Sequence, residues 1–411
     1  MEGYQGRLVD DLLDGLVREL PAVMLVGPRA TGKTTTGRRL AQTVVRLDRE
    51  AEAVAYQADP DAALRSLPEP ILLDEWQAVP EVLGAVKRAV DDDPRPGRFI
   101  LTGSVRADLE AETWPGTGRV VRISMYGLTR REVDGDVGAP MFLDRVVPGS
   151  AGLRLPPVVP DLRGYVELAL AGTFPESVLR LSPAVRTRWL DGYLDQLLTR
   201  DADQLAGLRD PLRLRRYFEA VALNTAGLAT DRTLYEAAGV TAKTAAVYDD
   251  LLANLFVVDA LPAWTTNRLS RLVRGPKRYV VDAALVASAL RMGVDGVLRD
   301  GNLLGRLLDT FVMSQLRPEV EVSELRPRLY HARVEQGRHE IDILVELSGD
   351  RVIAIEVKAD AAPTAAAARH LEWLRDQLGD RFLTGIVLHT GPRIYELGER
   401  VLAVPICALW G

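Results

Sequence analysis

The sequence predicts an α/β protein built from several domains, and three observations lead to this prediction. A glycine-rich loop lies near the N-terminus, between a short apolar run and a helix-like stretch. Apolar runs then alternate with helical stretches, which is typical of a parallel sheet covered by helices. Near the C-terminus, two patterned strands precede a third that carries a Glu-x-Lys pattern. At 411 residues, the chain is also too long for one ordinary domain.

The composition narrows the classes of protein to consider. With 47% hydrophobic and 26% charged residues, the chain resembles soluble globular proteins. A net charge of −6 argues against a wholly basic nucleic-acid coat, but not against a local basic face. The single cysteine, Cys407, excludes an intramolecular disulfide framework. We find neither a signal-peptide pattern nor an uncharged apolar run of about 18 residues, and therefore expect a cytoplasmic protein without membrane contact.

The glycine-rich loop, residues 27–34, reads Gly-Pro-Arg-Ala-Thr-Gly-Lys-Thr and fits the phosphate-loop pattern. Backbone N–H groups of such a loop surround phosphate oxygens at a helix N-terminus. Lys33 is predicted to reach the β- and γ-phosphates as a catalytic residue, and Thr34 to bind Mg²⁺. The alternative, a glycine turn with an exposed lysine, leaves the flanking strand and helix unexplained. The residues predicted to contact ATP are Gly27, Pro28, Arg29, Ala30, Thr31, Gly32, Lys33, Thr34, Thr35, Asp74 and Ser104.

Two acids follow a later apolar run, residues 70–73, and are predicted to complete the nucleotide site. Asp74 is placed to hold Mg²⁺, and Glu75 to orient or deprotonate the attacking water as a catalytic residue. A solvated acidic turn is the alternative. A small-molecule kinase is a rival, but the acidic pair favours water as the nucleophile. At the next strand tip, Thr102 and Ser104 are candidates to contact the γ-phosphate or the attacking water, unless they form an ordinary strand-end turn.

These motifs, taken in order, resemble the prokaryotic AAA-type ATPase family whose second half is a domain of unknown function. The resemblance rests on four segments, residues 27–34, 72–80, 96–104 and 118–119. The family usually has Asp-Glu-Ile-Gln, whereas this chain has Trp76 in place of the isoleucine. The resemblance implies an ATPase domain, which we place at residues 1–133. It extends over nearly the whole chain, because segments near 172–176, 189–201, 385–391 and 404–410 also fit.

The middle of the chain is predicted to hold a linker and a helical region. Residues 134–164 are rich in proline and glycine, which predicts a linker. Residues 165–285 are predicted to be helical and winged-helix-like, with a helix–turn–helix over 231–255 and wing strands after it. Winged helices often bind DNA, but the second helix offers only Lys243 for reading bases, so we favour a packing module.

A basic stretch lies in the same region and leaves a DNA partner open. It contains no acidic residue, so it is suited either to a phosphate backbone or to a solvated rim beside an acidic neighbour. Its basic residues are Arg268, Arg271, Arg274, Lys277 and Arg278.

Residues 286–411 are predicted to form a second α/β domain with its own charged site. Strand alternation puts Glu356 and Lys358 on one face, and Asp342 on the preceding strand can meet them across the sheet. Two carboxylates bind Mg²⁺ or Mn²⁺, and a lysine steadies a nucleophilic water beside the ion. We therefore predict Asp342 and Glu356 as metal ligands and Lys358 as a catalytic residue. The alternative is a strand with a merely charged outer face.

This arrangement resembles the restriction-endonuclease-like, PD-(D/E)xK fold, and the family's C-terminal domain carries the same pattern. The resemblance implies a further acidic metal ligand on a helix, which here is Asp309 where the family usually has glutamate. We therefore expect a Mg²⁺-dependent ATPase whose hydrolysis drives a nuclease-like domain acting on nucleic acid. The alternative is an ATP-driven regulatory or binding protein whose degenerate nuclease fold is a docking surface. A homo-oligomer or a partner protein is compatible with both.

Overall fold

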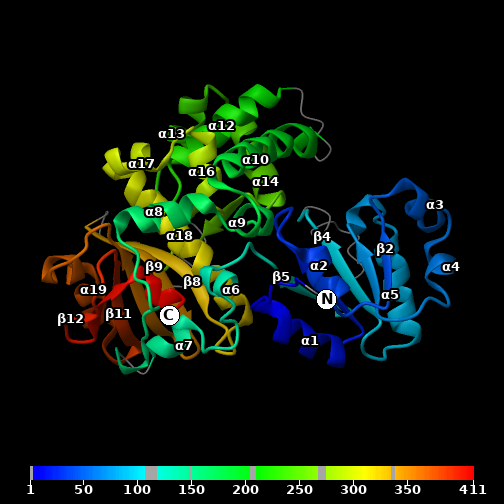
Figure 1. Cartoon of the computed structure of the whole chain (residues 1–411), viewed down its shortest axis with the longest axis horizontal. Helices are drawn as coiled ribbons and strands as arrows, with labels where there is room; N and C mark the ends of the chain where they lie inside the picture. The colour runs from blue at the N-terminus through cyan, green and yellow to red at the C-terminus, as the bar shows by residue number, and fades with distance from the viewer. Residues whose placement is uncertain (1–2, 107–117, 148–149, 204–209, 267–274, 335–337) are drawn as a thin grey trace. The chain divides into compact units, whose positions relative to one another are not determined.

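The computed structural model in Figure 1 describes residues 3–106, 118–147, 150–203, 210–266, 275–334 and 338–411. Its contacts divide the chain into two compact units. The first unit comprises residues 1–128 together with 252–256, and the second comprises residues 129–251 and 257–411. None of the described helices is long and apolar enough to cross a membrane.

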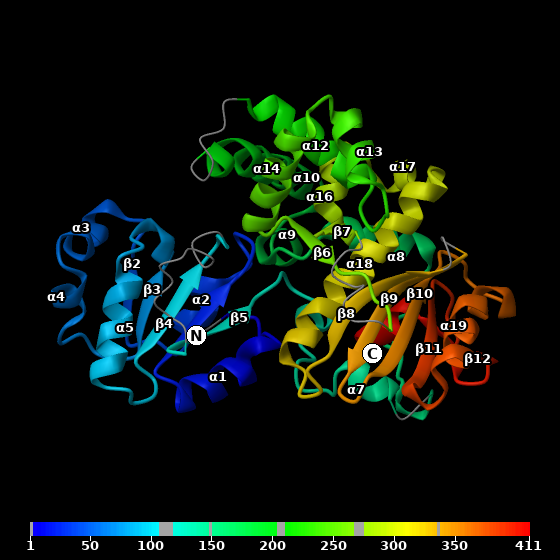
Figure 2. The ribbon, with the colours of Figure 1, turned by 180° about the vertical axis from the view of Figure 1, so that it is seen from behind.

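The first unit contains a five-stranded sheet of order β2-β3-β4-β1-β5, in which every neighbouring pair is parallel (Figure 2). The strands are β1 (Ala22–Val26), β2 (Thr43–Arg46), β3 (Ile71–Asp74), β4 (Phe99–Gly103) and β5 (Val120–Ser124). The helices are α1 (Val9–Glu19), α2 (Lys33–Arg38), α3 (Glu50–Ala58), α4 (Pro60–Leu64), η1 (Trp76–Ala78) and α5 (Val82–Asp92). This is the alternation of strands and helices predicted for the N-terminal part of the chain.

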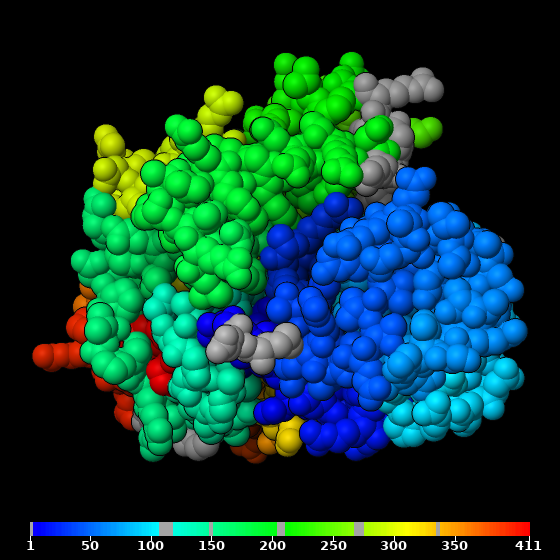
Figure 3. All heavy atoms as spheres, turned by 45° about the vertical axis from the view of Figure 1, so that its right-hand side comes forward, coloured from blue at the N-terminus to red at the C-terminus, as the bar shows by residue number. Residues whose placement is uncertain are grey.

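Helices cover both faces of this sheet, and β1, β3 and β4 are therefore buried along their whole length. One face packs with α5 in a core that includes Leu73 and Leu101. On the other face, Gly37 of α2 lies so close to Leu72 that an added Cβ would be 3.0 Å from its Cδ1 atom. Figure 3 shows one side of this unit as blue and cyan atoms. Parallel strands end at one edge of a sheet, so the segments that follow β1, β3 and β4 share that edge.

The second unit begins with helices. They are α6 (Arg130–Asp134), α7 (Phe142–Val146), η3 (Ser150–Gly152), α8 (Leu162–Ala171), α9 (Pro175–Leu179), α10 (Pro183–Gln196), the π-helical η4 (Leu197–Asp201), α12 (Pro211–Leu223), α13 (Asp231–Ala238), α14 (Ala242–Asn254), α16 (Ala283–Ala289), α17 (Val294–Arg299) and α18 (Gly301–Val322). The last three residues of α14, 252–254, belong to the first unit. Between α14 and α16, strands β6 (Val258–Leu261) and β7 (Lys277–Val280) form a two-stranded antiparallel sheet.

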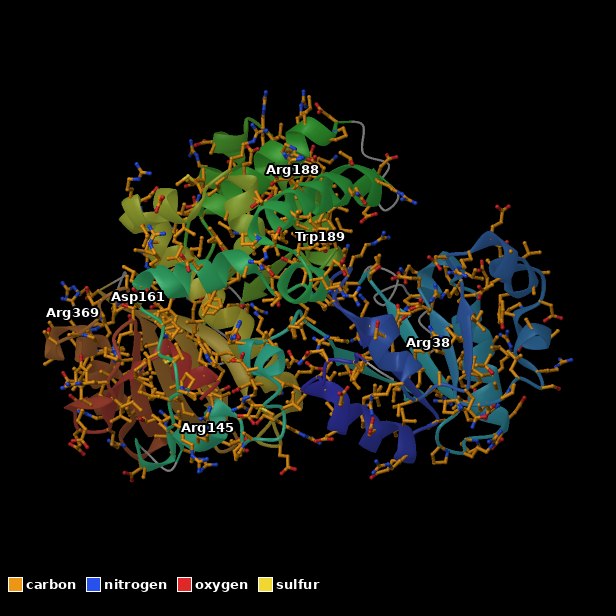
Figure 4. All side chains as sticks on the ribbon, in the orientation of Figure 1. Arg38, Arg145, Asp161, Arg188, Trp189 and Arg369 are labelled. Carbon is orange, nitrogen blue, oxygen red and sulfur yellow. The ribbon has the colours of Figure 1, made fainter. Side chains whose placement is uncertain are left out.

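The segment interpreted as a linker, residues 134–164, contains helix α7 and packs within the second unit. Phe142 is buried and donates its backbone N–H to Glu319 of α18 at 2.9 Å. Arg145, labelled in Figure 4, donates from Nη2 to the Ala408 carbonyl oxygen at 2.9 Å. Both contacts lie within the second unit, which begins at Thr129, whereas the first domain was expected to end at residue 133.

The second unit ends with a six-stranded mixed sheet of order β12-β13-β11-β10-β9-β8. Its strands are β8 (Arg328–Val334), β9 (His339–Leu347), β10 (Arg351–Val357), β11 (Phe382–His389), β12 (Tyr395–Gly398) and β13 (Val401–Pro405). Three helices accompany the sheet, namely α19 (Ala365–Leu378), η6 (Gly379–Arg381) and η7 (Ile406–Leu409). Leu371 of α19 packs with Leu344 and Ala354 in the core of one face. In β9 and β10, register pairs Ile343 with Ile355 as the last partners, and Asp342 and Glu356 are the residues that come next to this pair on the two strands.

Candidate functional site

The phosphate-loop segment connects β1 to α2 and follows a fully buried strand. Gly27 has φ of 152°, and an added Cβ would lie 2.1 Å from the Met125 carbonyl oxygen, so only glycine fits. Gly32 has φ of 95° at the N-cap of α2. In this loop Arg29 is half-buried and Ala30 is exposed, while Thr35 is exposed on the first turn of α2. The loop is therefore held in shape by its glycines at the carboxyl edge of the sheet.

Lys33 is buried inside this loop. Its Nζ donates to the carbonyl oxygens of Gly27 at 2.9 Å and Pro28 at 2.7 Å. The Thr31 hydroxyl donates to the same Pro28 oxygen at 2.9 Å. Burial lowers the pKa of Lys33 to about 8, although Glu75 and Asp74 oppose the shift. The ammonium is therefore poorly hydrated, and anionic phosphate oxygens would stabilise its charged form.

The structure brings Thr34 and Asp74 together from two elements. The Thr34 hydroxyl donates to Oδ1 of Asp74 at 2.7 Å, and the Thr102 hydroxyl donates to the same oxygen at 2.5 Å. Asp74 ends β3 and is buried, whereas Thr34 lies in the first turn of α2. A hydroxyl and a carboxylate at this position are the oxygen donors that a Mg²⁺ ion on nucleotide phosphates takes. The pair therefore fits the predicted ion.

Glu75 follows Asp74 in the left-handed region, with φ of 54°. Its Oε2 accepts hydrogen bonds from the Ser104 hydroxyl at 2.8 Å and from the Gln77 side-chain amide. Ser104 therefore contacts the predicted catalytic carboxylate, and its contact with the nucleotide stays a prediction. Sequence reasoning gave Gln77 no role, although it stands in the family's Asp-Glu-x-Gln pattern. Gly103 leaves room for the buried Trp76 here, because an added Cβ would be 2.5 Å from Nε1 of that indole.

A second group of charged residues lies in the second unit, and we call Asp309, Asp342, Glu356, Lys358 and Lys277 the carboxylate–lysine cluster. Lys358 Nζ lies 2.8 Å from Oε2 of Glu356. The Val357 N–H donates to Oδ2 of Asp342 at 3.1 Å. Lys277, the first residue of β7, lies 2.9 Å from Oδ1 of Asp342 and 3.4 Å from Oδ2 of Asp309. The three predicted carboxylates thus surround two ammonium groups.

The electrostatics of the cluster follow from its burial. Burial and the neighbouring Asp342 raise the pKa of Asp309 to about 7, and the same two causes raise the pKa of Glu356 well above its usual range. Burial acts in the same direction on Asp342, but Lys277 and Lys358 outweigh it and hold its pKa low. For Lys277, the two aspartates outweigh burial and raise the pKa well above its usual range. Asp342 and Lys277 therefore form a charged pair.

The arrangement of this cluster differs from the metal site predicted from the sequence. Among the residues that the structure describes, no three His, Cys, Asp or Glu side chains are grouped so as to hold a metal ion. Instead, the ammonium of Lys277 contacts both Asp309 and Asp342. Sequence reasoning assigned Lys277 to the basic stretch, because nothing local distinguishes a buried lysine from an exposed one.

The basic stretch is described only in part, because Arg268, Arg271 and Arg274 lie outside the described residues. Its two described members have carboxylate partners within the second unit. Lys277 is buried in the cluster, and Arg278 pairs with Asp231 at 2.6 Å and Asp249 at 3.1 Å. These two side chains are therefore occupied and do not form the exposed basic surface that the sequence left open.

The parallel sheet, the glycine-shaped loop and the Thr34–Asp74 pair together define the class of P-loop nucleotide-binding proteins. Residues 19–134 match the family described as an AAA domain. Residues 162–295 and 304–409 match two domains of unknown function, DUF8612 and DUF4143. The first unit is therefore an ATPase domain of the AAA type.

Two mycobacterial proteins are similar to almost the whole chain. They are Uncharacterized protein Mb2031c of Mycobacterium bovis and Uncharacterized protein Rv2008c of Mycobacterium tuberculosis, each 31% identical over 392 residues. The match covers 94% of this chain and 80% of each relative. The chain belongs to the same family as these two proteins.

A solved structure is also similar, the Walker-type ATPase PABY2304 of Pyrococcus abyssi, with 15% identity and a TM-score of 0.42. That match covers 69% of this chain and 94% of the other. None of the comparisons bears on the restriction-endonuclease-like fold of the C-terminal part, which stays a prediction.

Proposed function

We propose that this protein is a Mg²⁺-dependent ATP hydrolase and that hydrolysis drives a change read out by its second unit. The proposal rests on one observation, the hydrogen bond from Thr34 of the phosphate loop to Asp74, the residue before Glu75. Phosphoryl transfer needs charge stabilisation and a positioned nucleophile more than covalent chemistry. Lys33 would stabilise charge on the phosphates, Thr34 and Asp74 would hold Mg²⁺, and Glu75 would position water.

This function is tested with the purified full chain by measuring nucleotide binding and phosphate release. We expect hydrolysis to require Mg²⁺, and Lys33→Ala to abolish tight ATP binding because it removes the charge facing the phosphates. The matched control is Arg38→Ala, which removes a charge from the exposed last turn of the same helix (Figure 4). Hydrolysis without Mg²⁺, or equal losses in both variants, would contradict the roles assigned.

Two functions of the second unit are considered, and they differ in whether the carboxylate–lysine cluster is catalytic. One is nuclease action on DNA, which is supported by the pairing of Asp342 with Glu356 and by Lys358 beside them. The other is a regulatory or binding role in which a degenerate nuclease fold is a docking surface. The ammonium of Lys277 between two carboxylates favours the second output. The DNA partner, self-association and the cytoplasmic location stay predictions.

A further inference from the structure

Lys277 is the most deeply buried cation of the second unit's charged cluster, with only 1% of its side chain exposed. It begins β7, where register pairs it with Leu261 of β6. Its ammonium contacts one oxygen each of Asp342 and Asp309, and it also lies 5.5 Å from the ring centre of Tyr279. A buried ammonium persists in the charged form only when carboxylates or other acceptors compensate it. Its position is therefore defined by the two aspartates.

The other hydrogen-bond donors of the cluster bind carboxylate oxygens, but two carboxylate oxygens have no donor. Lys358 is bound to Oε2 of Glu356, and the Val357 N–H is bound to Oδ2 of Asp342. In contrast, Oδ1 of Asp309 and Oε1 of Glu356 are buried and have no hydrogen-bond partner among the described residues. Unsatisfied carboxylate oxygens are the ligands that a hard divalent ion takes. These two oxygens are thus the acceptors left for a cation if the lysine is removed.

We propose that the Nζ of Lys277 is the resident cation of this cluster and that the native chain binds no divalent metal ion there. The ammonium supplies positive charge to Oδ2 of Asp309 and Oδ1 of Asp342. A metal ion held by these two carboxylates at about 2.0–2.6 Å would be repelled by that ammonium and would compete with it for space. A lysine on a strand cannot provide the Lewis acidity or the activated water of a metal ion. The cluster is then a structural, metal-independent feature, and the proposal is independent of ATP hydrolysis by the first unit.

The central test removes the lysine and asks whether a metal ion replaces it. The full chain carries Asp74→Asn throughout, without nucleotide, so that the phosphate loop contributes no metal site. Lys277→Met should lower the melting temperature by roughly 10 °C, because it leaves buried carboxylates uncompensated. Millimolar Mn²⁺ should raise the melting temperature of this variant most of the way back. Electron paramagnetic resonance should then detect one bound Mn²⁺ ion per chain. The protein with Lys277 intact should show neither effect.

The matched control is Lys358→Met, which removes an ammonium from the same cluster but leaves Lys277 in place. We expect this variant to gain no Mn²⁺ site. The proposal is overturned if Lys277→Met folds and gains no Mn²⁺ binding, or if Lys358→Met gains as much.

A second measurement keeps the proposal testable if Lys277→Met does not fold. Mn²⁺ binding is compared between the chain with an intact cluster and Asp342→Asn. One ion bound to the intact cluster and lost in Asp342→Asn would refute the proposal, and no binding to either supports it.

Discussion

At the scale of single residues, Glu75 shows how a predicted catalytic group is held by neighbours. The left-handed backbone at Glu75 is uncommon for a residue with a side chain and turns the chain sharply after Asp74. Two side chains, Ser104 and Gln77, then bind one oxygen of the carboxylate. A carboxylate held at one oxygen keeps the other available to orient water. The strained backbone and the paired donors therefore indicate a positioned rather than a merely solvated acid.

We predict that Glu75→Gln lowers the rate of ATP hydrolysis by about 10²–10⁴-fold, because a positioned base is lost. The dissociation constant for ATP should hardly change, since Lys33 and the loop remain. Gln77→Leu should cause a smaller fall by releasing the carboxylate. Single-turnover hydrolysis and separate nucleotide titrations measure these effects. The exposed acid Glu81, changed to Gln, is the control. A Glu75 variant that loses binding as strongly as hydrolysis would disprove the role.

At the scale of elements, helix α18 organises the second unit through polar contacts on a largely buried surface. Its Gln315 accepts a hydrogen bond from the Arg130 N–H at 2.6 Å, and its Glu319 accepts one from the Phe142 N–H at 2.9 Å. Arg131 lies 3.8 Å from Glu319, and both side chains are buried. The segment after the first unit is thereby attached to α18. A proline-rich composition alone had indicated a linker here.

We predict that Glu319 makes the stability of the second unit dependent on pH. Burial raises its pKa to about 7, although Arg131 and Arg145 oppose the shift. When the pKa of a carboxyl group is higher in the folded than in the unfolded state, its contribution to stability is fully present below the unfolded pKa, which is near 4.5 here. That contribution is lost as pH rises through the folded pKa of about 7. Glu319→Gln should remove up to about 3 kcal/mol of this pH dependence of the free energy of unfolding. The amide oxygen of Gln still accepts the Phe142 hydrogen bond.

The measurement is denaturant unfolding of both proteins at pH 5 and pH 7. The free energy of unfolding of Glu319→Gln minus that of the native chain should be more positive at pH 7 than at pH 5. The exposed Glu324, changed to Gln, is the matched control on the turn after α18. An identical pH profile for Glu319→Gln and the native chain would show that Glu319 does not titrate in this range.

At the scale of the whole molecule, the two units carry separate charged sites of different chemistry. The first places a lysine and a hydroxyl–carboxylate pair around a glycine-shaped loop, which suits a mobile anionic ligand. The second places two lysines among three carboxylates of the chain itself, so its charges are compensated internally. We therefore expect chemistry at the first site and structure or docking at the second.

This expectation predicts the outcome of a DNA cleavage assay. The purified chain, given Mg²⁺ or Mn²⁺ with ATP, should cut supercoiled plasmid no faster than its Asp342→Asn variant. The reason is that a nuclease of this type needs an activating metal ion, whereas Lys277 holds the cation position. Both proteins should hydrolyse ATP at the same rate. Metal-dependent cleavage that Asp342→Asn abolishes would instead establish the nuclease.

Local order in the sequence was enough to predict most of the first site. The loop residues 27–34, the acids after β3 and the alternation of strands and helices are encoded within short segments, so their spacing predicts their geometry. The same holds for Asp342, Glu356 and Lys358, because strand alternation and an antiparallel pair place them together. The spacing of residues along the chain did not predict which other side chains these residues contact.

The sequence by itself therefore predicted the P-loop ATPase fold, the phosphate loop and the proximity of Asp342, Glu356 and Lys358, whereas Asp309 came from the family resemblance. Only the tertiary structure decided that Ser104 and Gln77 hold Glu75, and that Lys277 enters the carboxylate cluster. Lys277 lies 32 positions from Asp309 and 65 from Asp342 in the chain. The burial of a charge depends on which distant segments pack around it, and no local pattern records that packing.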